Sequence, residues 1–312
     1  MLAFSCARKD EGVASKGIAV FIPGVLSGSP TYELLVKGVR AGLEGVSNIE
    51  LTVIEAGFNQ AEWETKLSAA AASEKYELII SSNPSLPDIA NRVSAKFPKT
   101  KYMIFDGELS GNPSIYTLNY DKRAQAYALG TFAALLSAEM DSRTAGLISA
   151  QHYPVMDEQI MPSYLEGARS INPAMDVDFR IVGHWSDPDK ALELADDMIS
   201  GGIKVILTIA GAGNEGVVQA AAKRGAKVLW FDTNAYSYRP GVIAGCCATY
   251  QDKAAEVKIR EYLNGELRFG VCQTLGFREG YIDFIEDDPL YTENISENVR
   301  KKQAEIVAKL RE

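Results

Sequence analysis

The chain has 312 residues, enough for about two domains, and 46% of them are hydrophobic, as is typical of a globular protein with a sizeable core. Its formal net charge of −9 argues against nucleic acid as a partner and against broad adsorption to anionic lipid. The longest apolar stretch, residues 124–138, is interrupted by polar side chains and is shorter than the ~18 residues that a membrane span needs.

The first residues, MLAFSC, resemble the end of a lipoprotein signal, with a small apolar patch, Ser5 and then Cys6. The polar stretch ARKDEGVASKG follows, as expected of a tether. We therefore expect residues 1–16 to be a signal remnant and flexible tether that carries lipid on Cys6. An ordinary cysteine in a tail is the alternative, because this stretch lacks the charged part and most of the apolar part of a signal.

Strands alternate with helices along the rest of the chain. The first series predicts strands at 18–22, 50–56, 77–81, 101–105 and 115–118, with helices at 31–43, 60–73 and around 89–96. A long helix is predicted over 121–140. The second series predicts strands at 145–149, 176–182, 205–209, 228–231, 241–248 and 281–284, with helices at 162–170, 188–199, 214–223, 252–264 and 296–311. This alternation predicts an α/β protein with parallel sheets.

A strand–helix–strand unit occurs twice, at residues 76–106 and 204–232. Both copies end in K-x-x-x-F-D, so that Asp106 and Asp232 stand 126 positions apart at equivalent places. Ligands of open parallel sheets bind at the carboxyl ends of the strands. Two similar halves therefore predict two similar lobes whose strand ends face a shared cleft.

Candidate ligand-binding residues follow the predicted strands. Asp106 and Asp232 can accept hydrogen bonds, although an acid at a strand end can also merely cap a turn. Several aromatic residues in these loops suggest stacking on a flat ligand, although each alone is commonly a packing residue. The predicted set is Tyr32, Asn83, Asp106, Asn119, Tyr120, Tyr153, Trp185, Gly211, Asn214, Asp232, Tyr236 and Thr249.

The run GAGNEG at 211–216 fits the pattern G-x-G-x-x-G after a strand and before a helix, and Asp232 follows at the spacing of a ribose-binding acid. An NAD(P)-dependent dehydrogenase is therefore the rival hypothesis. The match lies in the second half of the chain, whereas the fingerprint marks the first unit of a dinucleotide fold. A tight turn whose helix N-terminus donates N–H groups is the simpler interpretation.

The four cysteines, Cys6, Cys246, Cys247 and Cys272, have no zinc-finger or C-x-x-C spacing. A disulfide from Cys246 or Cys247 to Cys272 and a set of free thiols both stay open. The chain has two histidines, His152 and His184, which excludes a histidine-rich metal site and favours hydrogen-bonding roles. We expect no catalytic residue and no metal, because no nucleophile–base pair is visible.

Several motifs together resemble the basic membrane protein (BMP) family of substrate-binding lipoproteins that serve ABC importers. They are YELIISSN (76–83), FPKTKYMIFDG (97–107), LGTFAALLSAEM (129–140), YLEGARSINP (164–173), IAGAGNEGVVQAAAKRGAKVLWFD (209–232) and DKAAEVKIREYLNG (252–265). The resemblance covers residues 17 to about 285. It implies a type I periplasmic-binding-protein fold, in which two Rossmann-like lobes joined by three crossovers close around one small ligand.

This resemblance also implies the domain boundaries. The N-terminal lobe would comprise residues 17–120 and 250–275, and the C-terminal lobe residues 121–249 and 276–312. It further implies a lipid-anchored protein in the periplasm or another extracytoplasmic location, with an ABC permease and its ATPase as partners. We expect a monomer that touches the membrane only through the lipid on Cys6, and no cofactor apart from the transported ligand.

The ligand is indicated by departures from the family's nucleoside binders. Those proteins carry D-x-S-F-N in the first loop, where this chain has residues 28–32, GSPTY, so both polar base readers are replaced there. A ribose-binding lysine of the family falls on Thr249, whereas the acid is retained as Asp232. Tyr32 favours a wider ring, and the resemblance to riboflavin-binding members suggests riboflavin, with a purine nucleoside as the alternative. A structural or adhesive lipoprotein is a third class.

Overall fold

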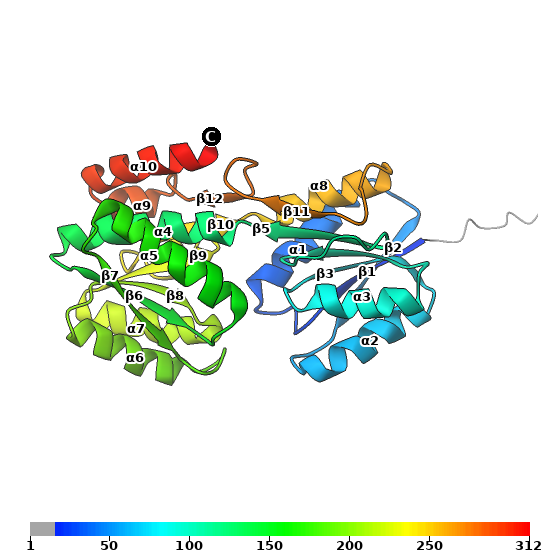
Figure 1. Cartoon of the computed structure of the whole chain (residues 1–312), viewed down its shortest axis with the longest axis horizontal. Coiled ribbons are helices and arrows are strands. Elements are labelled where there is room, and N and C mark those ends of the chain that lie inside the picture. The colour runs from blue at the N-terminus through cyan, green and yellow to red at the C-terminus, as the bar shows by residue number, and fades with distance from the viewer. Residues whose placement is uncertain (1–15) are drawn as a thin grey trace, which may run out of the picture. The chain divides into compact units, whose positions relative to one another are not determined.

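The computed structural model describes residues 16–312 of the chain (Figure 1). Cys6 lies outside the described residues. The chain divides into two compact units. Unit 1 runs up to Leu118 and includes Asp252–Gln273, and unit 2 comprises Asn119–Gln251 and Thr274–Glu312. Both units are discontinuous in the sequence, because the chain enters unit 2, returns to unit 1 and enters unit 2 again.

Unit 1 is built on a six-stranded sheet with the strand order β11-β5-β4-β3-β1-β2. The pairs β1/β2, β1/β3, β3/β4 and β4/β5 are parallel. The strands are β1 (Lys16–Ile22), β2 (Ile49–Glu55), β3 (Tyr76–Ser82), β4 (Lys101–Phe105), β5 (Ile115–Tyr120) and β11 (Cys272–Leu275). The first five strands were predicted to within a few residues, whereas β11 was not predicted.

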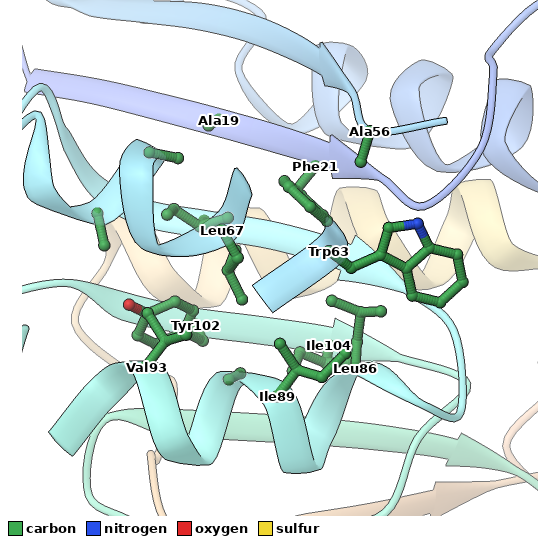
Figure 2. Packing of buried hydrophobic residues seen from close by; sticks show 14 of the residues in the cluster. Ala19, Phe21, Ala56, Trp63, Leu67, Leu86, Ile89, Val93, Tyr102 and Ile104 are labelled. Atoms are coloured by element: carbon green, nitrogen blue, oxygen red, sulfur yellow. The ribbon is translucent and has the colours of Figure 1, made fainter. Parts of the chain in front are cut away.

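Four helices cover this sheet: α1 (Pro30–Gly42), α2 (Gln60–Ala72), α3 (Leu86–Lys96) and α8 (Gln251–Leu263). Figure 2 shows Trp63 and Leu67 of α2 and Ile89 and Val93 of α3 facing strand residues such as Phe21 across one hydrophobic core. On the other face α1 packs closely on α8. A Cβ atom on Gly38 would lie 2.1 Å from the carbonyl oxygen of Asp252, so this helix contact requires glycine.

Unit 2 repeats the architecture with the strand order β12-β10-β9-β8-β6-β7. Its neighbouring strands pair in parallel except β10/β12, which is antiparallel. The strands are β6 (Thr144–Ser149), β7 (Asp176–Ile181), β8 (Val205–Ile209), β9 (Lys227–Asp232), β10 (Ile243–Thr249) and β12 (Ile282–Phe284). The α/β class with parallel-dominated sheets, predicted from the alternation of strands and helices, is confirmed.

The helices of unit 2 are α4 (Lys122–Glu139), α5 (Met161–Ile171), α6 (Pro188–Ser200), α7 (Asn214–Arg224), α9 (Pro289–Asn294) and α10 (Glu297–Arg311). Short turns of other helical types occur at Met156–Ile160, Gly211–Gly213 and Tyr236–Tyr238. Helices α4 and α5 cross in near-contact at two glycines. A Cβ atom on Gly130 would lie 2.0 Å from the backbone carbonyl oxygen of Tyr164, and one on Gly167 would lie 2.2 Å from the backbone carbonyl oxygen of Tyr127.

Candidate functional site

Unit 1 carries a pocket of about 250 Å³ at the carboxyl ends of its strands. Three segments line it: the start of α1, the residues that end and follow β3, and the residue that follows β4. They contribute Ser29, Pro30, Thr31, Tyr32, Ser82, Asn83, Pro84 and Asp106. Three predicted binding residues, Tyr32, Asn83 and Asp106, are therefore brought together in one cavity, although they are far apart in the sequence.

These three residues combine an aromatic face with polar groups. Burial raises the pKa of the Tyr32 hydroxyl above its ordinary value, a hydrogen bond with the Asn83 side chain opposes this, and the charge of Asp106 adds to it. The Asn83 side-chain oxygen accepts the N–H of Ser85 at 2.9 Å, which leaves the amide N–H groups for Tyr32 or a ligand. The Asn83 backbone N–H donates to the carbonyl of Phe105 at 3.1 Å and ties the ends of β3 and β4 together.

Asp106 and Asp232, at the ends of the two copies of the strand–helix–strand unit, share an uncommon backbone conformation. Asp106 has φ 53° and Asp232 has φ 70°, both in the left-handed region that most L-residues avoid. Aspartate tolerates this region better than most side chains, because its short polar group can bond locally. Strained backbone of this kind is concentrated at functional sites. The two equivalent strand ends thus share both a carboxylate and the turn that presents it.

In unit 2 the carboxylate of Asp232 is paired with Lys122. The Lys122 ammonium nitrogen lies 3.2 Å from Oδ1 of Asp232 and 5.5 Å from the ring centroids of both Tyr120 and Phe231. Lys122 is only 8% exposed, whereas 40% of the Asp232 side chain is exposed. The result is a buried cation held between two aromatic rings and an acid that solvent or a ligand can still reach.

Lys122 was missed by the sequence reasoning. It lies in the first turn of α4, where a cation opposes the helix dipole and is therefore unfavourable unless an acid lies nearby. That position, immediately after Tyr120 and Asp121, was the available signal. Asp121 supplies part of the compensation, because its side chain accepts the N–H of Ala124 at 3.0 Å and caps the helix.

Two other predicted residues of unit 2, Thr249 and Tyr120, are buried. Thr249 ends β10 one position beyond Ala248, which pairs in register with Asp232 of β9. Thr249 is 7% exposed, and its hydroxyl has no hydrogen-bond partner among residues 16–312. Asn119 and Tyr120 end β5, where the chain passes from unit 1 into unit 2. Asn119 is half-buried, and the Tyr120 ring is buried beneath Lys122.

A second aromatic group of unit 2 contains Tyr153 and Trp185. Their ring centroids are 6.0 Å apart with an interplanar angle of 43°, and Trp185 is 44% exposed. The Trp185 carbonyl accepts the N–H of Ala212 at 2.9 Å. Gly211 has φ 61°, and a Cβ atom there would lie 2.6 Å from that same carbonyl oxygen. Gly211 is therefore required by the close approach of two loops.

The rest of the G-x-G-x-x-G run also has packing explanations. A Cβ atom on Gly216 would lie 1.9 Å from the carbonyl oxygen of Pro188, so glycine allows α7 to approach α6. The Asn214 side-chain oxygen accepts hydrogen bonds from the Thr208 hydroxyl at 2.7 Å and from the Ala210 N–H at 2.8 Å. Asn214 thus joins the end of β8 to the start of α7, and the run fits a structural turn.

Tyr236 does not belong with the candidate binding residues. It is 0% exposed, its hydroxyl donates to the carbonyl of Ile285 at 3.0 Å, and it accepts the N–H of Cys246 at 3.1 Å. A position after a predicted strand suggested a loop aromatic, but the side chain turns into the core of unit 2. We therefore withdraw Tyr236 from the predicted set.

The histidines and cysteines have ordinary environments. Nδ1 of the exposed His152 lies 2.8 Å from Oδ1 of Asp157, and Nδ1 of His184 lies 2.9 Å from the Ser186 hydroxyl. Cys246, Cys247 and Cys272 are free thiols. Within residues 16–312 there is no group of three or more side chains suited to hold a metal ion, and none of the helices described is long and apolar enough to cross a membrane.

Two discontinuous α/β units with candidate ligand-binding residues at their strand ends define a type I periplasmic-binding-protein fold. A solved ABC-transporter solute-binding protein from Aeropyrum pernix K1 has this fold, with a TM-score of 0.77 and 21% identity over 95% of this chain and 86% of that chain. Residues 15–311 match the Bmp family model, described as ABC transporter substrate-binding protein PnrA-like. The chain belongs to this family.

Two curated relatives illustrate its range. The CD4+ T-cell-stimulating antigen of Listeria monocytogenes is 24% identical over 52% of this chain and 44% of its own length. A purine-binding protein of Brucella abortus is 27% identical over 62% of this chain and 53% of its own length. The chain therefore spans about half the length of these relatives.

Proposed function

We propose that this protein captures a purine base or purine nucleoside and delivers it to the permease of an ABC importer. The observation that supports this most is the unit 1 pocket, in which Tyr32, Asn83 and Asp106 line about 250 Å³. A planar heteroaromatic ring can stack on a tyrosine face, and its N–H and C=O groups can pair with an amide and a carboxylate. The similarity to a protein named as purine-binding favours the same ligand class.

The pocket changes the balance between the two ligands considered from the sequence. The first loop, GSPTY at 28–32, lacks the polar base readers of the nucleoside binders, and this favoured riboflavin. Asn83 and Asp106 supply an amide and a carboxylate beside Tyr32 from the ends of β3 and β4. Polar groups for base recognition can therefore come from outside that first loop, and a purine becomes our first candidate.

Riboflavin remains the second candidate because of Tyr32. Its ring system is wider than a purine, and an aromatic side chain in the pocket wall favours a wide stacking surface. The pyrimidine edge of a flavin also presents N–H and C=O groups that an amide and a carboxylate can read. Ligand absorption distinguishes a flavin from a purine directly.

Asp232 is the residue that we assign to ligand hydroxyl groups. Lys122 is bonded to Oδ1, and Oδ2 accepts no hydrogen bond from residues 16–312. A ribose or ribityl hydroxyl can donate to that oxygen. Tyr153 and Trp185 are further candidates for aromatic contact with the ligand, because Trp185 is well exposed.

The family gives the wider setting of this function. Substrate-binding proteins of ABC importers act on the extracytoplasmic side and present a small molecule to a permease. We propose the same location here, with lipid on Cys6 as the anchor, the permease and its ATPase as partners, and a monomer as the working form. We expect binding without turnover and no cofactor apart from the transported ligand.

The test is to identify what the purified protein carries. The protein is denatured, and the released small molecules are identified by absorption spectroscopy and mass spectrometry. Calorimetric titrations of the ligand-free protein then compare a purine nucleoside, riboflavin and a plain sugar. The proposal predicts a purine and a loss of affinity in Tyr32→Ala and Asn83→Ala. Binding of the sugar alone, or chemical conversion of any ligand, would overturn it.

A further inference from the structure

One aromatic residue next to the pocket has no role in the binding scheme so far. Phe58 lies in the loop that connects β2 to α2. Its side chain is 73% exposed, the largest value among the exposed large hydrophobic residues in the described part of the chain. An exposed phenylalanine loses the stabilisation that burial would provide. When the loop around it is held in place, its exposure favours a binding role over a loosely packed loop.

Hydrogen bonds hold this loop at Ala56 and Gly57, immediately before Phe58. The N–H of Ala56 donates to the carbonyl of Ile22 at 2.8 Å, and that of Gly57 donates to Gly24 at 2.9 Å. The indole N–H of Trp63 donates to the carbonyl of Gly57 at 2.7 Å, and Lys66 donates to that of Ala56 at 2.8 Å. The Phe58 ring is therefore presented to solvent by an anchored loop.

Gly24 brings this ring next to the pocket. A Cβ atom on Gly24 would lie 3.2 Å from Cε1 of Phe58 and 3.2 Å from Cε2 of Tyr32. The edges of the two rings flank the same glycine and lie within about twice that distance of each other. Tyr32 lines the pocket, so Phe58 lies beside the pocket at the same edge of the sheet.

We propose that Phe58 is a ligand-contacting residue that extends the aromatic wall begun by Tyr32 and favours planar ligands over non-planar ones. This inference rests on the proposed function. A bound ring that reaches past Tyr32 would cover the exposed face of Phe58 and gain an aromatic contact. Gly24 lets both rings approach each other, because any side chain there would press against them.

The experiment compares Phe58→Ala and Phe58→Tyr with Tyr238→Ala, a matched control that removes another exposed aromatic residue, in unit 2. Affinities for a purine nucleoside, riboflavin and ribose are measured by calorimetry. Phe58→Ala should weaken the planar ligands by roughly 2- to 13-fold, the value of one aromatic contact. Phe58→Tyr and Tyr238→Ala should leave them unchanged, and the melting temperature of each variant should stay close to that of the wild type.

Failure of this inference is distinct from failure of the proposed function. A wild-type protein that binds no planar ligand refutes the proposed function itself. A wild-type protein that binds one, together with a Phe58→Ala variant of equal affinity, overturns the role of Phe58 alone. Reduced import by Phe58→Ala in cells at unchanged affinity would assign Phe58 to permease docking, and would also overturn the proposal.

Discussion

Replacing Asp232 by asparagine should separate recognition of the ligand's hydroxyl groups from recognition of its ring. Asparagine is the suitable replacement because it tolerates the φ of 70° at this position and keeps a side-chain oxygen for Lys122. Alanine would add a backbone penalty of about 1–2 kcal/mol and confuse the comparison. The substitution therefore removes the negative charge of the carboxylate, which pairs with Lys122 and to which we expect a ligand hydroxyl to donate.

The size of the effect follows from this geometry. A hydrogen bond to a charged acceptor contributes about 1.5–3 kcal/mol, which corresponds to roughly 13- to 160-fold in affinity. The Asp232 side chain is 40% exposed, so solvent weakens the interaction. We therefore expect the lower part of that range, a loss of roughly 13- to 40-fold for ligands that carry the hydroxyl groups.

The assay is calorimetric titration with matched ligand pairs. A purine nucleoside is compared with its free base, and riboflavin with lumichrome, which lacks the ribityl chain. Asp232→Asn should weaken only the first member of each pair. Asp106→Asn is the matched control at the equivalent strand end of unit 1, and it should weaken both members alike, because Asp106 lines the pocket with Tyr32. Equal losses for nucleoside and free base in Asp232→Asn would refute the assignment.

Three further predictions concern buried residues. Tyr102→Phe should keep or raise the free energy of unfolding by about 1 kcal/mol, because the Tyr102 hydroxyl has no hydrogen-bond partner among the described residues, whereas Tyr236→Phe should lower it by about 1–3 kcal/mol. Burial raises the pKa of Tyr102 to about 12, so stability should fall above about pH 10, where the unfolded tyrosine ionises. Urea titrations at about pH 9 and about pH 11 should show a loss of stability that is smaller by about 1.4 kcal/mol in Tyr102→Phe than in the wild type, because the other buried tyrosines contribute equally to both proteins, and an equal loss in the variant would contradict this cause. Gly130→Ala should lower the free energy of unfolding by about 1–3 kcal/mol in thermal unfolding, because its Cβ would lie 2.0 Å from the backbone carbonyl oxygen of Tyr164. Gly201→Ala is the control and should cost under about 0.5 kcal/mol, since its nearest neighbour lies at 3.3 Å; equal costs would refute the packing argument.

The alternation of strands and helices could be predicted because most strands are short runs of apolar residues. The predicted strand at 205–209 coincides with β8, whose five residues are all buried. Strand β11, CQTL, escaped prediction because it is short and only its last residue, Leu275, is buried. It becomes a strand through its place beside β5, which local sequence does not reveal.

Part of the candidate site could be predicted for a similar reason. The repeated K-x-x-x-F-D ending pointed to both Asp106 and Asp232, because equivalent strands end at equivalent edges. Phe58 and Lys122 were not predicted, because the exposure of Phe58 and the burial of Lys122 depend on tertiary neighbours. Tyr236 was wrongly included, since a position after a strand does not say whether the side chain faces outward or into the core.

The discontinuity of unit 1 has a consequence for how the protein is made. Its sheet needs β11 beside β5, and α1 needs α8 against Gly38, yet both partners belong to the segment that begins at Asp252. Asp252 is translated 134 positions after Leu118, a delay of roughly 7–27 s at ~5–20 residues per second. During that interval the nascent unit presents the open edge of β5 and an uncovered helix face, both of which favour aggregation. An N-terminal fragment that stops near Leu118 should therefore depend on chaperones, and unit 1 should reach its native stability only when the chain has passed Gln273.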